Sequence, residues 1–281
     1  MQFFDAHNHL QDPLLAPHLD SLAAQLPALG LRRAVVNGTR EDDWPAVSKI
    51  SIRLPWAVPS LGLHPWRAGG RSPRWLDRLR AALDAHPAAH VGEIGLDRWM
   101  LDRARPDDPR LAGLRRAPLG EQTEILAAQL ALAAARNRAA TIHCLDAWGA
   151  LAGLLEKTPL PARGFLLHAY AGPLEMVPRL ARLGAYFSFN TAFIHDPKKR
   201  HAATFAAIPA DRLLAETDAP AMPPPPPSRA RELPPAPDGT PLNHPANIVA
   251  AHTALAAIRG LPVKQLAARL ASNFETLFGP A

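Results

Sequence analysis

Cysteine is nearly absent from this chain of 281 residues, since Cys144 is the only one, and this excludes a disulfide within the chain. A lone cysteine suits a reducing compartment, so we expect a cytoplasmic protein. Long apolar runs are also missing, because no stretch approaches the roughly 18 apolar residues that a membrane span needs. The N-terminus lacks a basic region followed by an apolar one, so we expect no signal peptide and no membrane partner.

The sequence has no Gly-x-Gly-x-x-Gly turn after its first apolar run, which disfavours the alternative of a doubly wound dinucleotide-binding sheet. Short apolar runs predict eight strands, at 2–7, 31–37, 56–62, 89–94, 139–143, 164–168, 184–189 and 212–216. Helical patterns lie between them, near 14–29, 42–53, 73–86, 120–137, 146–156, 173–183 and 197–207, and two more follow near 244–259 and 262–278. Eight alternating strands and helices predict a (β/α)8 TIM barrel, an α/β fold, with extra C-terminal helices and residues 1–281 as a single domain.

Charge is the next feature, because the formal net charge of +6 favours an anionic partner. The positive charge is nearly all arginine in an alanine-, proline- and arginine-rich chain, so compositional bias explains it equally well. Two connections are unusually long. Residues 98–118 carry six arginines against three aspartates, and 222–241 contains five consecutive prolines that forbid a regular helix or sheet. Both follow strands with candidate ligands, so we expect them over the barrel mouth, although solvated insertions without function remain an alternative.

Metal-capable side chains stand at the ends of the predicted strands. His7 and His9 are two residues apart, so on a strand they would project from one face. The later strands end in His64, Glu93, His143, His168 and Asp218. Each of these alone has a structural explanation, such as a hydrogen-bonded core histidine or a cap. Without His64, these are six groups at the ends of five apolar strands, and together they would be costly to bury unless a dinuclear metal centre compensates them.

These motifs resemble those of the TatD-like metal-dependent hydrolases. They are His7-x-His9, Gly62-x-His64-Pro65, Gly92-Glu93-Ile94-Gly95-Leu96-Asp97, Ile142-His143, His168 and Glu216-Thr217-Asp218-Ala219-Pro220, with Asn243-x-Pro245-Ala246-Asn247 and Asn273-Phe274 towards the end. The resemblance implies a barrel that binds one or two divalent cations and hydrolyses phosphodiester bonds in DNA. It further implies that His7, His9, Glu93 and Asp218 hold one metal, and that Glu93 bridges to a second metal held by His143 and His168.

The resemblance also implies the remaining roles. His64 would sit beside the metals and contact the substrate. We expect Asp218 and Glu93 to be the catalytic residues, and we choose Asp218 as the general base because a carboxylate at the metal edge can accept the proton of the bound water. Four histidines favour zinc, manganese, cobalt or nickel over magnesium, although nuclease relatives are often written with magnesium. The metal therefore stays open.

The chain departs from the family where substrate is bound. Leu145 stands where members commonly have an arginine, and Asp238-Gly239 stands where an Arg-Gly often occurs. Two arginines that could clamp a phosphate are thus missing, and we expect Arg103 and Arg105 of the 98–118 connection to replace them. We predict a deoxyribonuclease acting on single strands or ends. The alternatives are a hydrolase of a small anionic phosphoester, an amide or a lactone, and a catalytically weak binding or scaffold protein.

Overall fold

Eight parallel strands form the centre of the computed structural model, which describes residues 1–195 and 200–280. The strands are β1 (Phe3–Asn8), β2 (Leu31–Asn37), β3 (Ala57–Ser60), β4 (Val91–Asp97), β5 (Ala140–Leu145), β6 (Phe165–Leu167), β7 (Ala185–Asn190) and β8 (Leu213–Glu216). Each predicted strand is confirmed to within three residues at either end. Most strand residues are buried, as in parallel sheets covered on both faces, which explains why apolar runs located them.

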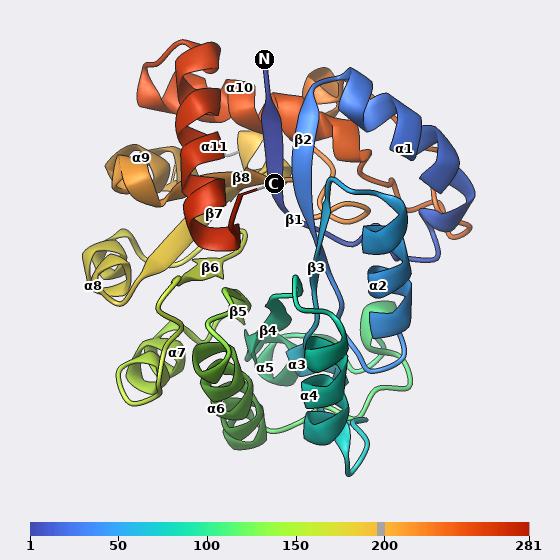
Figure 1. The fold of residues 1–281 in the computed structure, drawn as a ribbon, viewed down its shortest axis with the longest axis vertical. Helices are drawn as coiled ribbons and strands as arrows, with labels where there is room; N and C mark the ends of the chain where they lie inside the picture. The colour runs from blue at the N-terminus through green and yellow to red at the C-terminus, as the bar shows by residue number, and fades with distance from the viewer. Residues whose placement is uncertain (196–199, 281) are drawn as a thin grey trace.

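Helices alternate with the strands and surround them (Figure 1). They are α1 (Leu19–Ala28), α2 (Trp44–Arg53), α3 (Pro65–Ala68), α4 (Trp75–Ala85), α5 (Trp99–Asp102), α6 (Leu119–Ala135), α7 (Trp148–Leu155), α8 (Val177–Arg182), α9 (Arg200–Ala207), α10 (Ile248–Arg259) and α11 (Val263–Phe278). The predicted helix 197–207 is confirmed from residue 200 on, and its first three residues lie outside the described part. Helices α3 and α5 were not predicted, because four residues are too short to show a helical period.

The strands form two sheets, β1-β2-β3 and β4-β5-β6-β7-β8, which are joined edge to edge. At one seam, a parallel bridge links Ser60 to His90. At the other, the backbone N–H of Asp218 donates to the carbonyl of His7 at 2.9 Å, and that of His9 donates to Ala219 at 2.8 Å. This strand order is that of the predicted (β/α)8 barrel, and it brings the carboxyl ends of all strands to one face.

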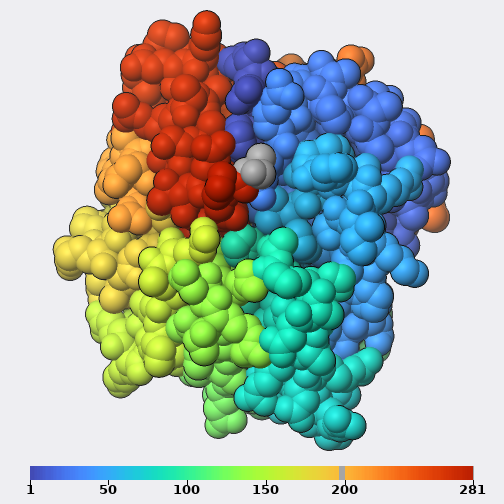
Figure 2. All heavy atoms as spheres, in the orientation of Figure 1, coloured from blue at the N-terminus to red at the C-terminus, as the bar shows by residue number. Residues whose placement is uncertain are grey.

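The opposite face is closed by α11. Phe274, Leu277 and Phe278 of this helix pack in one buried cluster with residues of the strands, among them Phe4 of β1 and Leu214 of β8. This cluster fills the barrel interior at the amino ends of the strands. A second, larger cluster of buried residues lies between the strands and the surrounding helices. Figure 2 shows the C-terminal helices beside the N-terminal strand on this face. With its amino end filled by α11, the barrel has its polar strand ends at the other mouth.

Both long connections contain little regular structure. Residues 98–118 hold α5 and a single 3-10 turn at Pro109–Leu111, and the proline-rich connection holds another at Pro226–Ser228. Within the described residues, no single helix is long and apolar enough to cross a membrane. Pro245–Arg259 and Val263–Phe278 meet that criterion only as a pair bent by 107°. The expectation of a single domain over 1–281 stays a prediction.

Candidate metal centre

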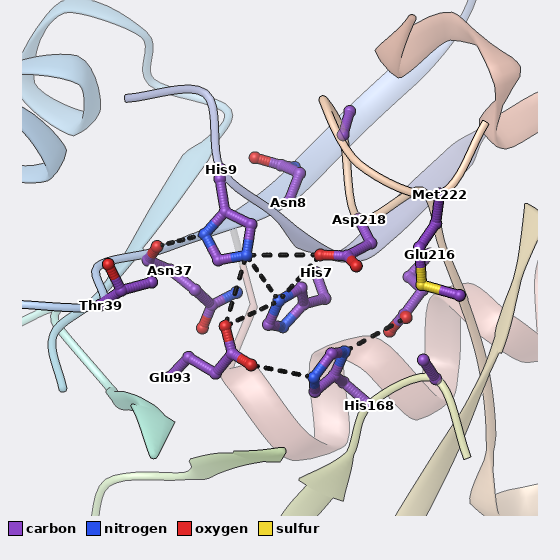
Figure 3. A network of polar contacts seen from close by, with 12 residues as sticks. His7, Asn8, His9, Asn37, Thr39, Glu93, His168, Glu216, Asp218 and Met222 are labelled. Atoms are coloured by element: carbon purple, nitrogen blue, oxygen red, sulfur yellow. Dashed lines mark hydrogen bonds and ion pairs between the residues drawn. The ribbon is translucent and has the colours of Figure 1, made fainter. Parts of the chain in front are cut away.

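The six predicted ligands meet at the carboxyl ends of the strands. Their side chains come from β1, β4 and β5, and from the residues that follow β1, β6 and β8. Figure 3 shows the side chains of His7, His9, Glu93 and Asp218 pointing towards one another, with His168 beyond Glu93. All six are buried or nearly so, although they are separated by up to 211 positions in the sequence (7 to 218). The sequence expectation that they converge on a common point therefore matches their placement.

One group of four ligand atoms has the spacing of a metal site. His7 Nε2 lies 3.1 Å from His9 Nε2, 3.5 Å from Glu93 Oε2 and 3.4 Å from Asp218 Oδ1. His9 Nε2 lies 3.3 Å from each of the same two carboxylate oxygens. Four atoms held tetrahedrally at about 2.1 Å from a cation lie about 3.4 Å apart, so this donor set fits a divalent metal.

A second group lies on the other side of Glu93. Its second oxygen, Oε1, is 3.3 Å from His143 Nδ1 and 3.0 Å from His168 Nε2. These two nitrogens are 3.3 Å apart. Each oxygen of Glu93 thus faces a different group of nitrogens, which is the geometry that a carboxylate bridging two cations requires.

The histidine tautomers are set by acceptors behind the ligands. His9 Nδ1 lies 2.7 Å from the carbonyl of Asn37, and His143 Nε2 lies 3.1 Å from Asp97 Oδ2. His168 Nδ1 faces Glu216 Oε1 at 3.4 Å. Carbonyl and carboxylate oxygens only accept, so these nitrogens carry the protons. The opposite nitrogen of each ring then offers its lone pair to the cluster, as metal-ligating histidines do.

His64 differs from the other histidines in its tautomer. Its Nδ1 accepts a hydrogen bond from the backbone N–H of Trp66 at 3.2 Å, so the neutral ring carries its proton on Nε2. That nitrogen donates to Glu93 Oε1 at 3.2 Å. Although His64 is close enough to Glu93 and His143 to join a ligand group, neutral His64 has no lone pair on Nε2 to give to a metal. This favours the expected substrate contact over a ligand role.

Sequence reasoning missed the residues that support the ligands. Asp97 and Glu216 were quoted within motifs but were given no role. Asp5 is another buried carboxylate, and it accepts from the Thr217 hydroxyl at 2.6 Å and from the backbone N–H of His7 at 3.2 Å. It thereby ties β1 to the segment that carries Asp218. The sequence does contain a signal for these residues, because all three carboxylates lie on apolar strands. Only the three-dimensional structure, however, distinguishes a carboxylate that faces the metal position from one that supports a ligand.

The electrostatics of the cluster favour ionised carboxylates. Burial would raise the pKa of Glu93, but His64, His168 and His7 hold that pKa well below its ordinary value. Burial likewise opposes protonation of His143, yet Asp97 and Glu93 together raise its pKa to about 9. The centre is thus built to hold positive charge next to two carboxylates, which is the environment that a divalent cation takes.

Two backbone features place the ligands. Asp218 has a φ of +57°, a left-handed conformation that is uncommon outside glycine and clusters at functional sites. Gly95 has a φ of +152°, and a Cβ at this position would lie 2.0 Å from the carbonyl oxygen of His143. The glycine therefore lets β4 approach β5 closely enough for Glu93 and His143 to meet, which explains its place in the Gly-Glu-Ile-Gly motif.

A cleft of about 570 Å³ opens above the cluster. Part of its wall is apolar, with Leu145, Phe193 and Met222 among the residues that line it. Among the described residues, its arginines are Arg40, from the loop that follows β2, and Arg67, from α3. The arginine commonly found at position 145 of the family is therefore replaced by an apolar wall.

The 98–118 connection does not supply cations to this cleft, which corrects the expected placement of Arg103 and Arg105. None of the described residues lining the cleft comes from this connection. Arg103 lies 3.4 Å from Asp146, and Arg105 pairs with Asp107 at 3.0 Å. Asp102 and Asp108 pair in the same way with Arg98 and Arg110. Each of the three aspartates in this connection therefore forms an ion pair with one of its six arginines, and the other three arginines account for the excess charge of +3.

Comparison with known proteins identifies the family. The model of the family described as "TatD related DNase" matches residues 4–279. The chain is 26% identical over 279 residues to an uncharacterized metal-dependent hydrolase, YjjV, of Escherichia coli K12, covering 99% of this chain and 98% of that protein. It is 28% identical over 280 residues to a protein named 3'-5' ssDNA/RNA exonuclease TatD from Enterobacter lignolyticus, covering 99% of both.

Solved structures agree with the sequence comparison. The crystal structure of the TatD homolog YjjV of Escherichia coli K12 has a TM-score of 0.83 at 26% identity, covering 99% of this chain and 98% of that one. A TatD-family hydrolase of Entamoeba histolytica has a TM-score of 0.81 at 17% identity and shares the fold, covering 100% of this chain and 99% of that one. The chain therefore belongs to the TatD family of metal-dependent hydrolases.

Proposed function

We propose that the chain hydrolyses phosphodiester bonds of DNA, at single strands or ends, with one or two divalent cations held by the six clustered residues. His7, His9, Glu93 and Asp218 would hold one cation, and Glu93, His143 and His168 the other. The observation that carries this proposal is the spacing of 3.0–3.5 Å among their ligand atoms, with one oxygen of Glu93 on each side. Family membership, with its metal-dependent hydrolases, supports the same reading.

The types of ligand atom in the cluster determine which metals it favours. Four imidazole nitrogens favour zinc, manganese, cobalt or nickel over magnesium, which prefers oxygen ligands and keeps several waters. A divalent cation in these positions supplies Lewis acidity, which acidifies water and offsets negative charge on the attacked phosphodiester.

The chain's own residues supply the proton transfers and the positioning. Among the described residues, Asp218 contacts the histidines through Oδ1 only, and its side chain lines the cleft. We assign it the role of general base, which takes the proton of the attacking water on a carboxylate oxygen. Glu93 holds the two groups of nitrogens together, and His64 is placed to donate from Nε2 to a substrate oxygen.

DNA as the substrate is supported by relatives named as ssDNA/RNA exonucleases and by the two arginines in the cleft. A second candidate is a small phosphoester, amide or lactone. One observation favours it, namely that Leu145, Phe193 and Met222 put apolar surface where a phosphate-binding arginine is common in the family. A pure scaffold is set aside, because the chain belongs to a family of hydrolases.

The test is a substrate panel with the purified protein loaded in turn with zinc, manganese, cobalt, nickel or magnesium. Single-stranded, blunt duplex and overhanging DNA labelled at either end would be compared with small phosphodiesters, amides and lactones. Release of nucleotides from single strands, abolished in Asp218→Asn, is the expected result. Turnover of a small ester without any cleavage of DNA would replace the nuclease proposal by the second candidate.

A further inference from the structure

A second cavity lies beside the cleft over the metal centre. This cavity has a volume of about 310 Å³ and lies beside the loops that follow β2 and β3. Arg40, Asp42, Trp66 and Arg67 line both cavities, so they lie between them, and we call these four residues the junction. A small substrate at the metal centre has no need of the junction, whereas a longer chain has to leave the cleft across its edge, where the junction lies.

The two arginines of the junction differ from those around it. In the second cavity, Arg71 and Arg115 both bind Glu121, and Arg78 binds Glu41 at 3.0 Å. Among the described residues, neither Arg40 nor Arg67 has a carboxylate within 4.0 Å of its guanidinium group.

Arg67 is also half-buried. Burial lowers its pKa, and the nearby charge of Arg40 lowers it further. Two guanidinium groups without an ionic partner, close to each other at the edge of a metal cleft, suit the oxygens of a phosphate.

Two carboxylates, Asp42 and Asp43, lie near these arginines. Asp43, which also lines the cleft, is occupied by the backbone N–H and hydroxyl of Thr39 at 2.9 and 2.8 Å. Asp42 is the only carboxylate that lines both cavities among the described residues. Asp43 keeps its charge and acts on Arg67, so Asp42 and Asp43 balance the two arginines in formal charge. Among the described residues, however, no carboxylate lies within 4.0 Å of either guanidinium group, so their N–H groups can donate to a phosphate.

Trp66 provides the aromatic part of the junction. Its ring stacks on Trp99 with centroids 6.3 Å apart and 26° between the planes, and the guanidinium group of Arg110 lies over Trp99 at 4.5 Å. The indole Nε1 donates to Asp97 at 2.6 Å, which fixes the ring in its plane. The side chain is half-buried and lines both cavities. A fixed, partly exposed indole between cations is the platform on which proteins stack single-stranded bases.

We propose that the junction binds the nucleotide adjacent to the scissile bond, with its base stacked on Trp66 and its phosphate held by Arg40 and Arg67. This inference rests on the proposed function and deepens it, because it names single-stranded nucleic acid as the substrate and gives the strand its path out of the cleft. The arginines of the junction then replace the ones missing at Leu145 and Asp238.

The base contact is tested with a short single-stranded oligonucleotide and a set of copies in which one nucleotide at a time is abasic. For the wild type, KM should rise ~5-fold or more when the abasic position falls next to the scissile bond. In Trp66→Leu the intact strand should show the same raised KM, and the abasic copy should show no further change. Trp66→Phe keeps an aromatic ring but loses the bond to Asp97, so it should retain most of the base effect.

This pair of variants separates stacking from a structural role. If Trp66 acts only by orienting Asp97, both variants lose kcat and metal content alike, and the ratio of KM for abasic and intact strands stays at its wild-type value. That result would overturn the base contact.

The phosphate contact is tested through salt dependence. Each phosphate contact on a single strand contributes about −0.7 to the slope of log affinity against log salt. The double variant Arg40→Gln/Arg67→Gln should therefore flatten the slope by about 0.7 to 1.4. The matched control is Arg182→Gln/Arg269→Gln, which removes two exposed arginines from α8 and α11 and should leave the slope unchanged.

The outcomes distinguish this inference from the function on which it rests. If the wild type cleaves intact and abasic strands with equal KM, and the junction variants keep its salt slope, the nuclease proposal stands and the junction is refuted. If the wild type cleaves no oligonucleotide under any metal but hydrolyses a small ester, the nuclease proposal fails and the junction fails with it.

Discussion

Replacing Asp97 with asparagine should weaken the second metal position selectively. Asp97 Oδ2 accepts from His143 Nε2 at 3.1 Å and from Trp66 Nε1 at 2.6 Å, while Oδ1 accepts from the N–H of Met100 at 2.8 Å. All three partners donate, and an asparagine side chain turns one of the acceptor oxygens into a donor. At least one partner then loses its acceptor, and His143 loses the negative charge that orients its ring.

The size of the effect follows from the supporting role of Asp97. Carboxylates behind ligating histidines typically contribute 10- to 100-fold in metal affinity, which is about 1.4 to 2.7 kcal/mol. The loss should fall on the position formed by Glu93, His143 and His168. The atoms of His7, His9 and Asp218 do not touch Asp97, so the affinity of the first position should change by less than about threefold.

The assay is a competition titration of zinc against a chromophoric chelator, fitted to two sites, on the wild type and Asp97→Asn. Asp107→Asn is the control, because this carboxylate is exposed and pairs only with Arg105. Circular dichroism would establish that the variants are folded. If Asp97→Asn binds two cations with wild-type affinity, the carboxylate does not orient His143 and the tautomer argument is wrong.

Three further predictions follow from single features. Asp218→Asn should abolish turnover while leaving the melting temperature nearly unchanged, because asparagine keeps the shape but cannot take a proton from water; hydrolysis at the wild-type rate would refute its role as base. His90 and His252 are buried and neutral, and burial lowers the pKa of each to about 4. The unfolded chain then binds more protons below pH 6.5, so each histidine should remove about 2 kcal/mol of stability between pH 7 and pH 5. Urea unfolding at pH 7 and at pH 5 measures the free energy of unfolding at each pH. If this free energy depends on pH in His252→Gln as it does in the wild type, the prediction is wrong. Gly95→Ala should lower the free energy of unfolding by more than ~1 kcal/mol, because its Cβ meets the His143 carbonyl at a positive φ; a wild-type melting temperature would show that β4 can shift.

The sequence predicted the barrel well because its strands are short apolar runs bounded by polar ends. The largest boundary error of a predicted strand is at the end of β4. The prediction ends this strand at residue 94, whereas β4 extends to Asp97, which is polar and yet buried. Apolar patterning has no means of including such residues, since it reads them as the end of the buried strand.

The candidate ligands were predictable for a related reason. A His, Glu or Asp near the carboxyl end of an apolar strand lies close to the barrel mouth, so all six meet there in the barrel, although Asp97 and Glu216 at the ends of β4 and β8 lie behind the ligands. The cations of the cleft were not predictable in this way. The positions of Arg40 and Arg67 depend on a loop and on the four-residue helix α3, neither of which has a readable period. The net charge of 98–118 does not tell where its arginines point. The apolar pattern of the sequence locates the strand ends, but the conformation of the segments that follow the strands determines which cations face the substrate.

The measurement that tests the central claim most directly is metal content per chain after equilibration with excess zinc and removal of the free ion. We predict two cations per chain for the wild type and one for His143→Ala/His168→Ala, which keeps His7, His9, Glu93 and Asp218. A wild-type protein that retains no cation, or a double variant that retains as many as the wild type, would contradict the assignment of these residues to a dinuclear centre.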